Sequence, residues 1–414
     1  FFIIRAIGLI AGYGFTLFIS RFYGAEVNGY VALSFSVFLI GSLIPRFGFD
    51  INLVKTFSSF PIQEAKKTYQ KVLTLSILAG LFLCLAGILF KDFFSDVFDI
   101  PDPIYVVLGF ISIPVWSLIS INAGVLRGLK KIKRFSFLTN AGRFILAVLI
   151  LFAGYYLFDF KDPEIPIIAH TIGLILLMCY SFYSVLRALK GVVPMATTTT
   201  TAYLRESYPL MFSLALVLLL GWTDTIFLGI FTTPADVGVY HVAFKLAALV
   251  GFALQSLNSI LAPKIAKFYK EEMKREFENL LSLVVKINFF TSVLIILLLV
   301  LFRSYILALF GDEFVVGGTL LIILCVGQFS NAFCGPVGVV FQMTGKQKTF
   351  QNLVLIAFII NLVLNFVLIK PYGYYGAAIS SIVSMSFWNF AGAFIVWKEY
   401  NIILAYVPFL NRKK

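Results

Sequence analysis

Long apolar stretches alternate with short polar connections along the whole chain. Each stretch is long enough to cross the roughly 30 Å hydrocarbon core of a bilayer as an α-helix. The pattern predicts an all-α, polytopic membrane protein with twelve transmembrane helices. The expected spans are residues 2–22, 29–56, 70–91, 103–127, 136–158, 165–188, 207–231, 237–263, 280–303, 316–342, 351–369 and 375–397. The second and eighth are long enough that we expect them to be tilted or bent, and Pro45 and Pro114 are expected kinks.

Basic residues are distributed unequally between the two sides of the predicted membrane topology. Of the 33 lysines and arginines, 24 lie in the even-numbered connections and adjoining helix ends or at the C-terminus, and five lie in the odd-numbered connections and adjoining helix ends. Because cytoplasmic loops carry the excess of such residues, we expect the even-numbered connections and both termini in the cytoplasm. The net charge of +13 therefore indicates topology and contact with anionic lipid headgroups, and it does not indicate a nucleic-acid partner.

Composition excludes several classes of protein. The chain is 60% hydrophobic and 13% charged, whereas soluble domains carry about 25% charged residues. Its four cysteines lie in apolar stretches without a CxxC pair or a cysteine/histidine cluster, so we expect neither a disulfide framework nor a metal site. The sequence has no Walker motif, and we expect no cofactor and no direct use of ATP. The first helix begins almost at Phe1, which we attribute to missing leader residues rather than to a cleaved signal peptide.

An internal repeat relates the two halves of the chain. Residues 26–30 (EVNGY) and 236–240 (DVGVY) share the pattern acid–Val–x–x–Tyr, and residues 128–131 (GLKK) resemble 345–348 (GKQK). Each pair occupies equivalent places in the predicted topology, the first pair outside and the second inside. We expect the acid and the tyrosine to act locally, at a helix N-terminus and at the membrane interface. The repeat predicts two six-helix bundles of the same orientation around a central polar cavity, with the substrate between them.

The midpoint of the chain supplies the expected domain boundary. A polar segment with a run of threonines at 197–201 reads as a flexible connection between the halves. The predicted organisation is an N-terminal bundle at 1–190, a cytoplasmic linker at 191–205, a C-terminal bundle at 206–398 and a cytoplasmic tail at 399–414.

Several short segments resemble polysaccharide-transport proteins. They are SRFYGAEVNGY at 20–30, DTIFLG at 224–229, DVGVY at 236–240, APKIA at 262–266 and GYYGAA at 373–378. Together they are similar to the Wzx-type O-antigen and lipid-linked oligosaccharide flippases of the multidrug/oligosaccharidyl-lipid/polysaccharide exporter superfamily. The resemblance covers nearly the whole chain, as weak patterns rather than one diagnostic signature.

This resemblance implies a V-shaped cavity that opens alternately to the two sides of the bacterial inner membrane. It implies a substrate oligosaccharide carried on polyprenyl pyrophosphate, with membrane lipids as surroundings and a polysaccharide polymerase and glycosyltransferases as partners. No catalytic residue is expected. The sequence identifies neither the sugars nor the coupling ion, so both proton and sodium coupling stay open.

Six charged residues fall inside the predicted spans. A charge at the bilayer centre costs at least about 2.5–3.5 kcal/mol, so each should face a hydrated cavity or a partner. Apart from residues assigned to the connections and the helix ends, they are Arg5, Arg46, Arg143, Lys245, Asp50 and Asp224. Lys245 is the main candidate to attract phosphate or an acidic sugar, because it lies within a long helix one turn from His241.

Most of these charges have two interpretations. Arg46 and Asp50, four residues apart on one helical face, form a structural ion pair or belong to the cavity. Asp224 either pairs with Lys245 or couples transport to a proton or ion. Arg143 either anchors the inner membrane face or contributes to the substrate site.

The first helix carries a further candidate. Arg5 either snorkels to the interface or contacts pyrophosphate. In the peptidoglycan-precursor relatives of the family, arginines on the first, second and eighth helices bind pyrophosphate. The resemblance therefore implies substrate contacts for Arg5, Arg46 and Lys245, although a lysine lacks the bidentate fork of an arginine.

Neutral polar residues add further candidates. Gln255 and Asn258 either bind sugar hydroxyls or hold helices together. His170 and His241 are packing residues or members of a proton relay.

Two other functions fit parts of the pattern. A cation-coupled multidrug antiporter of the same superfamily typically has an acid in its first helix, whereas this helix carries Arg5 and reaches its first acid at Glu26. A membrane enzyme of polysaccharide assembly needs a sizeable extramembrane loop, and the expected outer loops are about a dozen residues or fewer. The flippase is therefore the leading hypothesis.

Overall fold

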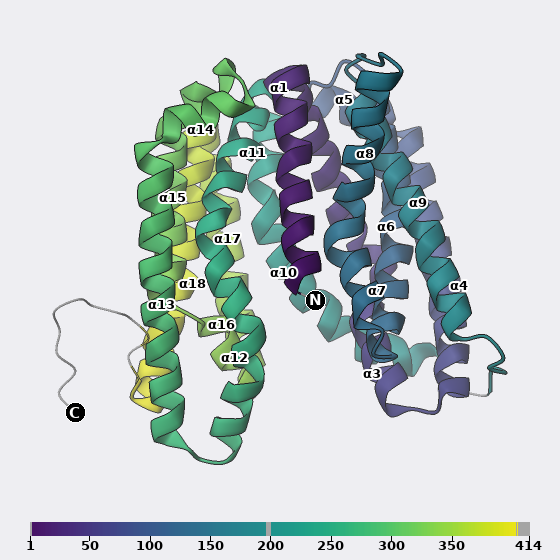
Figure 1. Ribbon diagram of the computed structural model, residues 1–414, viewed down its shortest axis with the longest axis vertical. Coiled ribbons are helices and arrows are strands. Elements are labelled where there is room, and N and C mark those ends of the chain that lie inside the picture. The colour runs from purple at the N-terminus through teal and green to yellow at the C-terminus, as the bar shows by residue number, and fades with distance from the viewer. Residues whose placement is uncertain (1, 196–199, 403, 405–414) are drawn as a thin grey trace. The chain divides into compact units, whose positions relative to one another are not determined.

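The computed structural model describes residues 2–195, 200–402 and 404 (Figure 1). Helices make up this part of the chain, and no strand occurs within it, so the all-α prediction is confirmed. The chain divides into two compact units, Phe1–Gly238 and Val239–Lys414. Residues 196–199 of the predicted linker and 403 and 405–414 of the predicted tail lie outside the described residues.

The first unit contains the helices up to the start of α11. They are α1 (Phe2–Gly41), α2 (Leu43–Arg46), α3 (Phe49–Ser59), α4 (Ile62–Leu89), α5 (Lys91–Val97), α6 (Ile104–Gly128), α7 (Ile132–Ser136), the π-helix η1 (Phe137–Ala141), α8 (Gly142–Leu157), α9 (Ile165–Ala188), α10 (Thr200–Phe231) and α11 (Pro234–Ala248). The unit boundary falls inside α11, and α10 packs on α1 and α3 of the first unit. The predicted division into halves at 190–206 stays a prediction.

The second unit contains the remaining helices. They are the 3₁₀ turn η2 (Leu249–Gly251), α12 (Phe252–Lys270), α13 (Lys274–Leu301), α14 (Arg303–Phe310), the 3₁₀ turn η3 (Asp312–Gly317), α15 (Gly318–Cys334), α16 (Val337–Met343), α17 (Gln347–Tyr372) and α18 (Tyr374–Tyr400). Within this unit, α18 packs on both α15 and α17, and α13 packs on α12 and α15.

Ten helices of the described chain are long and apolar enough to cross a membrane, against twelve predicted spans. The first of the ten, Ile3–Arg46, has 44 residues, which at 1.5 Å per residue is about 66 Å, twice the hydrocarbon thickness. Gly24 breaks this stretch with a non-helical φ of 87°. The predicted eighth span is not among the ten; it corresponds to α11, η2 and α12. The difference in number is thus one merged pair and the absence of the eighth span from the ten.

Both spans that were expected to be tilted or bent contain an irregular backbone segment. After α1, the backbone turns at Phe47 and Gly48, which have φ values of 42° and 73°. The eighth span changes to a 3₁₀ turn at Leu249–Gly251. Pro114 lies inside helix α6, and a kink there stays a prediction.

Helix α6 is at the centre of the first unit, in contact with α1, α3, α4 and α9. Its Asn122 side chain joins two neighbours, because it accepts a hydrogen bond from the Tyr69 hydroxyl at 2.7 Å and donates one to Ser181 Oγ at 2.8 Å. Small residues permit the close packing: a Cβ on Gly124 would lie 2.2 Å from the Asp50 carbonyl oxygen. Small residues and polar side chains between helices are typical of packing within membranes.

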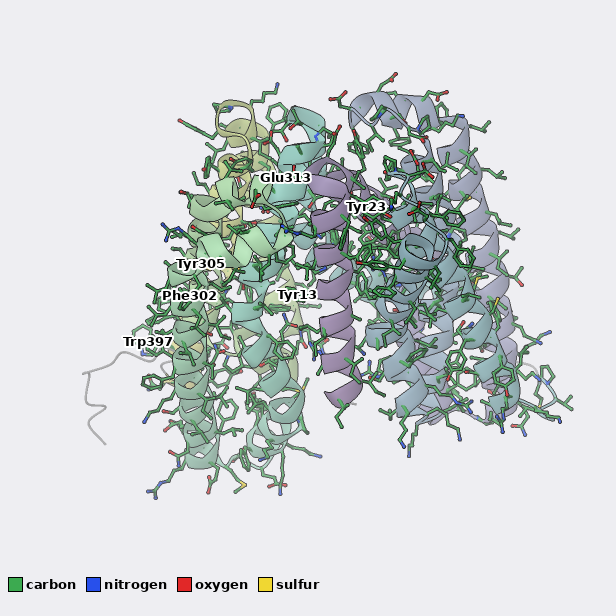
Figure 2. All side chains as sticks on the ribbon, turned by 45° about the horizontal axis from the view of Figure 1, so that its top comes forward. Tyr13, Tyr23, Phe302, Tyr305, Glu313 and Trp397 are labelled. Atoms are coloured by element: carbon green, nitrogen blue, oxygen red, sulfur yellow. The ribbon has the colours of Figure 1, made fainter. Side chains whose placement is uncertain are left out.

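Large apolar side chains cover the outer surfaces of the helices (Figure 2). Tyr305, Phe302 and Trp397 of the second unit are examples, with exposed fractions of 77%, 49% and 46%. In water such a surface would be unfavourable, whereas lipid tails are as apolar as the side chains themselves. Together with the ten apolar helices, this surface describes a multi-pass membrane protein.

Candidate functional site

A buried cation lies inside the first unit. Arg143, the second residue of α8, is 9% exposed, and its Nε donates a hydrogen bond of 2.8 Å to Nε2 of His170 on α9. Helices α8 and α9 pack side by side (Figure 1). The histidine is fully buried. Arg143 is therefore an interior residue rather than an anchor at the membrane surface.

Aromatic rings surround the Arg143 guanidinium. Its Cζ lies 4.4 Å from the ring centre of Phe35, 4.6 Å from Phe144, 4.8 Å from Phe38 and 5.7 Å from Trp116. Within about 6 Å, the face of an aromatic ring attracts a cation. The rings come from α1, α6 and α8, so the cation joins three helices of the unit. We call Arg143, His170 and these four rings the arginine cluster.

Arg46 and Asp50 form the ion pair that their spacing suggested. Arg46 Nη2 and Asp50 Oδ2 are 2.6 Å apart, and each side chain is 14% exposed. The pair bridges the turn between α2 and α3. Arg46 Nε and Asp50 Oδ1 are buried and have no hydrogen-bond partner in the described structure, so the pair retains unused polar atoms.

The other predicted site residues are spread over both units. Arg5 on α1 is half-buried, and Asp224 on α10 is buried with 3% exposure. His241 and Lys245 are half-buried on the part of α11 that lies in the second unit. Because Asp224 and Lys245 belong to different units, their pairing stays a prediction.

Two polar residues of α12 differ in exposure. Gln255 is exposed, whereas Asn258, three residues later, is half-buried and has an Oδ1 atom without a hydrogen-bond partner in the described chain. Their predicted contact with sugar hydroxyls stays a prediction. Among the described residues, no group of three or more His, Cys, Asp or Glu side chains has a metal-binding arrangement.

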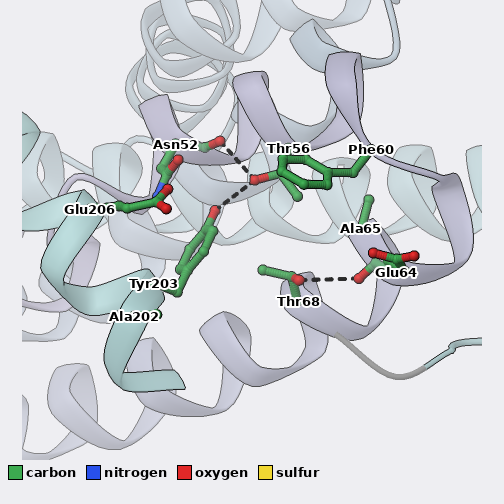
Figure 3. Close-up of a pocket in the computed structure, with 9 residues that line it drawn as sticks. All are labelled: Asn52, Thr56, Phe60, Glu64, Ala65, Thr68, Ala202, Tyr203 and Glu206. Carbon is green, nitrogen blue, oxygen red and sulfur yellow. Dashed lines mark hydrogen bonds between the residues drawn. The ribbon is translucent and has the colours of Figure 1, made fainter. Parts of the chain in front are cut away.

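A small polar cavity of about 40 Å³ lies between α3, α4 and the first turns of α10 (Figure 3). Thr56 Oγ1 and the Tyr203 hydroxyl are 3.1 Å apart across it. Nearby, Asn52 Nδ2 donates a hydrogen bond of 2.9 Å to Ser207 Oγ. This volume holds a few water molecules and is far below the several hundred Å³ of a typical ligand pocket. We interpret it as a packing junction that fixes α10 on the first unit.

A larger cavity of about 360 Å³ lies in the second unit, lined in part by Tyr269, Glu399 and Tyr400. Lys346 Nζ is 2.5 Å from Glu399 Oε2 at its edge. This hydrogen bond raises the pKa of Lys346 above its ordinary value. The lysine therefore stays charged at neutral pH and holds the beginning of α17 against the end of α18.

Comparison with known proteins identifies the family of the chain. Residues 1–269 match the family model described as polysaccharide biosynthesis protein, which is more than half of the chain. The chain belongs to the polysaccharide biosynthesis protein family. Residues 209–367 also match the MatE model. The resemblance to polysaccharide-transport proteins that the sequence motifs suggested is therefore confirmed.

Curated relatives are similar over part of their length. The probable low-salt glycan biosynthesis flippase Agl15 of Haloferax volcanii is 24% identical over 172 residues, which are 40% of this chain and 35% of that protein. The capsular polysaccharide biosynthesis protein CapF of Staphylococcus aureus is 31% identical over 177 residues, which are 42% of this chain and 45% of that protein. The matches thus span less than half the length of these two relatives.

Solved structures share the fold over nearly the whole chain. The lipid II flippase MurJ in an inward closed conformation has a TM-score of 0.77 and 16% identity, and the match covers 95% of this chain and 86% of that one. An inward-facing multidrug resistance MATE family transporter of the MOP superfamily has a TM-score of 0.77 and 14% identity, with 95% of each chain covered. The protein therefore has the fold of MOP superfamily transporters. The names of these neighbours describe flippases and transporters rather than enzymes.

The arginine cluster is the feature that sequence reasoning missed. The predicted fifth span began at 136, which put Arg143 near its end. In the structure, α7, η1 and α8 continue from Ile132, so Arg143 is 11 residues, about 16 Å, from the beginning of this helical stretch. A buried arginine also needs a partner, and the buried His170 on the next helix was the one signal that pointed to it.

Proposed function

We propose that the protein moves a lipid-linked glycan across the membrane by alternating access. More specifically, we propose that the substrate is a polyprenyl-pyrophosphate-linked oligosaccharide, an O-antigen or related surface polysaccharide unit. The protein would act in the bacterial inner membrane, with both of its termini in the cytoplasm. The observation that carries the proposal is the family match over residues 1–269. The relatives named as a glycan flippase and a capsular polysaccharide protein support it.

The charges inside the helices agree with an anionic substrate. Arg46 and Arg143 lie within helical stretches of the first unit, and Lys245 is in the last turn of α11. A guanidinium or ammonium group in a site of low dielectric offsets the desolvation of pyrophosphate. We assign first contact with the substrate to Arg46, Lys245 and Arg5, with Gln255 and Asn258 nearer the sugars. Asp224, Asp50 and His241 are then the candidates for ion pairing or coupling.

The MatE match and the MATE neighbour favour a second candidate, a cation-coupled multidrug antiporter. Its difficulty is that α1 contains a single acid, Glu26, and the Tyr30 hydroxyl donates a hydrogen bond to it at 2.5 Å. An acid engaged in this way is poorly placed to exchange a coupling cation. The flippase therefore explains more of the interior charge.

A reconstitution assay separates the two functions. Purified protein is placed in liposomes with a short-chain polyprenyl pyrophosphate that carries a fluorescent disaccharide, and dithionite is added outside to bleach accessible label. We expect protein to expose the inner-leaflet label, Arg46→Gln to slow this exposure, and Arg303→Gln, which changes an exposed arginine, to leave it unchanged. Label that stays protected would overturn the proposal. Ethidium transport driven by a sodium or proton gradient in the same vesicles would support the antiporter.

A flippase of this kind works between other proteins. A glycosyltransferase must build the lipid-linked unit on one side, and a polymerase must consume it on the other. We therefore propose these two enzyme classes as functional partners and membrane lipids as direct contacts. Proton or sodium coupling is proposed as the driving force, and it is measured by repeating the flipping assay with each gradient collapsed in turn.

A further inference from the structure

The cavity of about 360 Å³ in the second unit has no part in the transport proposed above. It lies where α12 ends, α13 begins and α18 ends, and these three segments meet at one end of the unit (Figure 1). Phe277 and Ile402 are buried residues of its lining, with 4% and 5% exposure. Tyr269, Glu272 and Lys274 are exposed residues of the same lining. The cavity therefore joins an apolar interior to a charged and accessible rim.

The adjoining helices indicate how deep this cavity lies in a membrane. Helix α13 has 28 residues and α18 has 27, so each is about 40 Å long and exceeds the roughly 30 Å hydrocarbon core. At the cavity, α13 begins with four charges in its first five residues, and α18 ends in the sequence WKEY at 397–400. Tryptophan and tyrosine are typical of the membrane interface. The cavity thus lies at the level of the lipid headgroups rather than in the hydrocarbon.

Three aromatic rings form one wall of the cavity. The ring centre of Tyr269 lies 5.9 Å from that of Tyr400 and 6.4 Å from that of Phe277, and the last two centres are 6.2 Å apart. Tyr269 is the most accessible of the three, with 41% exposure. The face of an aromatic ring attracts an ammonium group. This wall therefore favours a ligand with a cationic part.

The rim carries charges of both signs. Glu399 is engaged by Lys346, whose Nζ lies 2.5 Å from the Glu399 Oε2 atom. Glu272 and Lys274 form no ion pair among the residues that the structure describes, and both line this cavity. One acid and one base in this position suit a ligand that has an anion and a cation of its own. A purely anionic ligand would meet two carboxylates, and juxtaposed like charges select against it.

We propose that this cavity binds the headgroup of phosphatidylethanolamine, a membrane phospholipid with a phosphate and a primary ammonium. Lys274 contacts the phosphate as a point charge. Glu272 accepts charge-assisted hydrogen bonds from the ammonium, which lies against the Tyr269 ring. A quaternary choline headgroup has no N–H donor for this carboxylate and binds more weakly. The site recognises a membrane lipid and does not depend on the glycan that the protein moves.

Thermal unfolding of the purified protein in detergent tests the proposal. Phosphatidylethanolamine, phosphatidylcholine and phosphatidylglycerol with identical acyl chains are titrated in parallel. A ligand that binds the folded state raises the unfolding temperature with its concentration. We expect the ethanolamine lipid to act at about tenfold lower concentration than the other two, because it alone satisfies both charges of the rim. Equal responses to the three lipids would overturn the proposal.

The two charges give variants with different expected effects. Glu272→Gln should raise the required concentration of the ethanolamine lipid about tenfold, so that its advantage over the choline lipid disappears. Lys274→Gln should weaken all three lipids, which share the phosphate, and keep their order. Glu276→Gln and Lys270→Gln are matched controls, because both residues are exposed in the same stretch and lie outside the cavity lining. Equal lipid responses of Glu272→Gln and Glu276→Gln would overturn the proposal.

The aromatic wall is tested with a second pair of variants. Tyr269→Phe keeps the ring and should retain the lipid response. Tyr269→Leu removes the ring and should weaken the ethanolamine lipid about threefold, the effect of one cation–π contact at an accessible site. Equal responses of these two variants would contradict the contact between the ring and the ammonium.

Native mass spectrometry provides an independent readout. With the three lipids present in equal amounts, the wild type should retain phosphatidylethanolamine preferentially, and Glu272→Gln should show no preference. Glycerophosphoethanolamine, the headgroup without acyl chains, separates a lipid from a soluble ligand in the unfolding assay. Stabilisation by this soluble compound at the same concentration as the lipid would assign the cavity to a soluble ligand and overturn the proposal.

Discussion

Asn28 Nδ2 donates a hydrogen bond of 3.1 Å to the carbonyl oxygen of Gly238, 210 residues later in the chain. The same displacement relates the two copies of the sequence repeat, so Asn28 and Gly238 are equivalent positions of EVNGY and DVGVY. The repeat thus identifies a direct contact between α1 and α11 within the first unit, as well as an internal similarity.

Glycine is required on both sides of this contact. A Cβ on Gly238 would lie 1.9 Å from the Ala25 carbonyl oxygen, and one on Gly29 would lie 1.8 Å from that of Pro234. Since backbone atoms cannot move aside cheaply, we predict that Gly238→Ala and Gly29→Ala each destabilise the protein by about 1–3 kcal/mol. Thermal unfolding in detergent measures the effect. Gly221→Ala on α10 is the control, because its added Cβ would meet nothing within 4 Å, and unfolding temperatures equal to this control would contradict the prediction.

The Arg46–Asp50 pair allows structural and substrate roles to be separated. Arg46→Gln and Asp50→Asn each leave a mostly buried charge without its partner, so we predict a loss of about 1.5–3 kcal/mol for each. The exchange Arg46→Asp with Asp50→Arg restores opposite charges and should recover most of the stability. We expect flipping in liposomes to stay low in the exchanged protein, because the cation has moved from the position assigned to substrate binding. Recovery of transport together with stability would show that the pair is purely structural.

Periodicity and charge identified the class of fold because both depend on the bilayer rather than on details of packing. Long apolar spans, the all-helical fold and the turn within the second span were all readable from the sequence. Gly24, where α1 departs from helical geometry, lies in the connection predicted between the first two spans. The contact of α10 with α3 was missed, since the pattern described residues 191–205 as linker whereas α10 begins at Thr200.

Site residues were less predictable than spans. Arg46 and Asp50 were predicted as a possible pair because four residues is a local distance along a helix, and the structure brings them together. Arg143 and His170 are 27 residues apart on different helices. Their meeting depends on how α8 rotates against α9, and one sequence does not specify that rotation. Whether a charged side chain within a span points into the bundle or out of it is likewise determined by helix packing.

The turn between α2 and α3 depends on Gly48. Gly48 has a φ of 73°, and a Cβ there would lie 2.6 Å from the Ser207 carbonyl oxygen of α10. The left-handed conformation alone costs a residue with a side chain about 1–2 kcal/mol, so we predict at least this loss of stability for Gly48→Ala. Gly14→Ala is the matched control, since its Cβ would have open space and alanine is the better helix former. Equal unfolding temperatures for the two variants would contradict the assigned role of Gly48.

The junction of α10 with α3 provides the last prediction. Tyr203→Phe removes the hydroxyl that lies 3.1 Å from Thr56 Oγ1, while the ring keeps its stacked position 6.1 Å from Phe49. We predict a loss of about 0.5–1.5 kcal/mol for this variant and for Thr56→Val.

The double variant should lose less than the sum of the two, because both single changes remove the same hydrogen bond. Tyr208→Phe on the same helix is the control, since this tyrosine is 54% exposed and surface changes usually stay within about 0.5 kcal/mol. Strict additivity, or a Tyr203→Phe effect no larger than that of Tyr208→Phe, would mean that the polar contact does not hold α10 on the first unit. A confirmed coupling would make the first turns of α10 part of the packed first unit rather than a free connection.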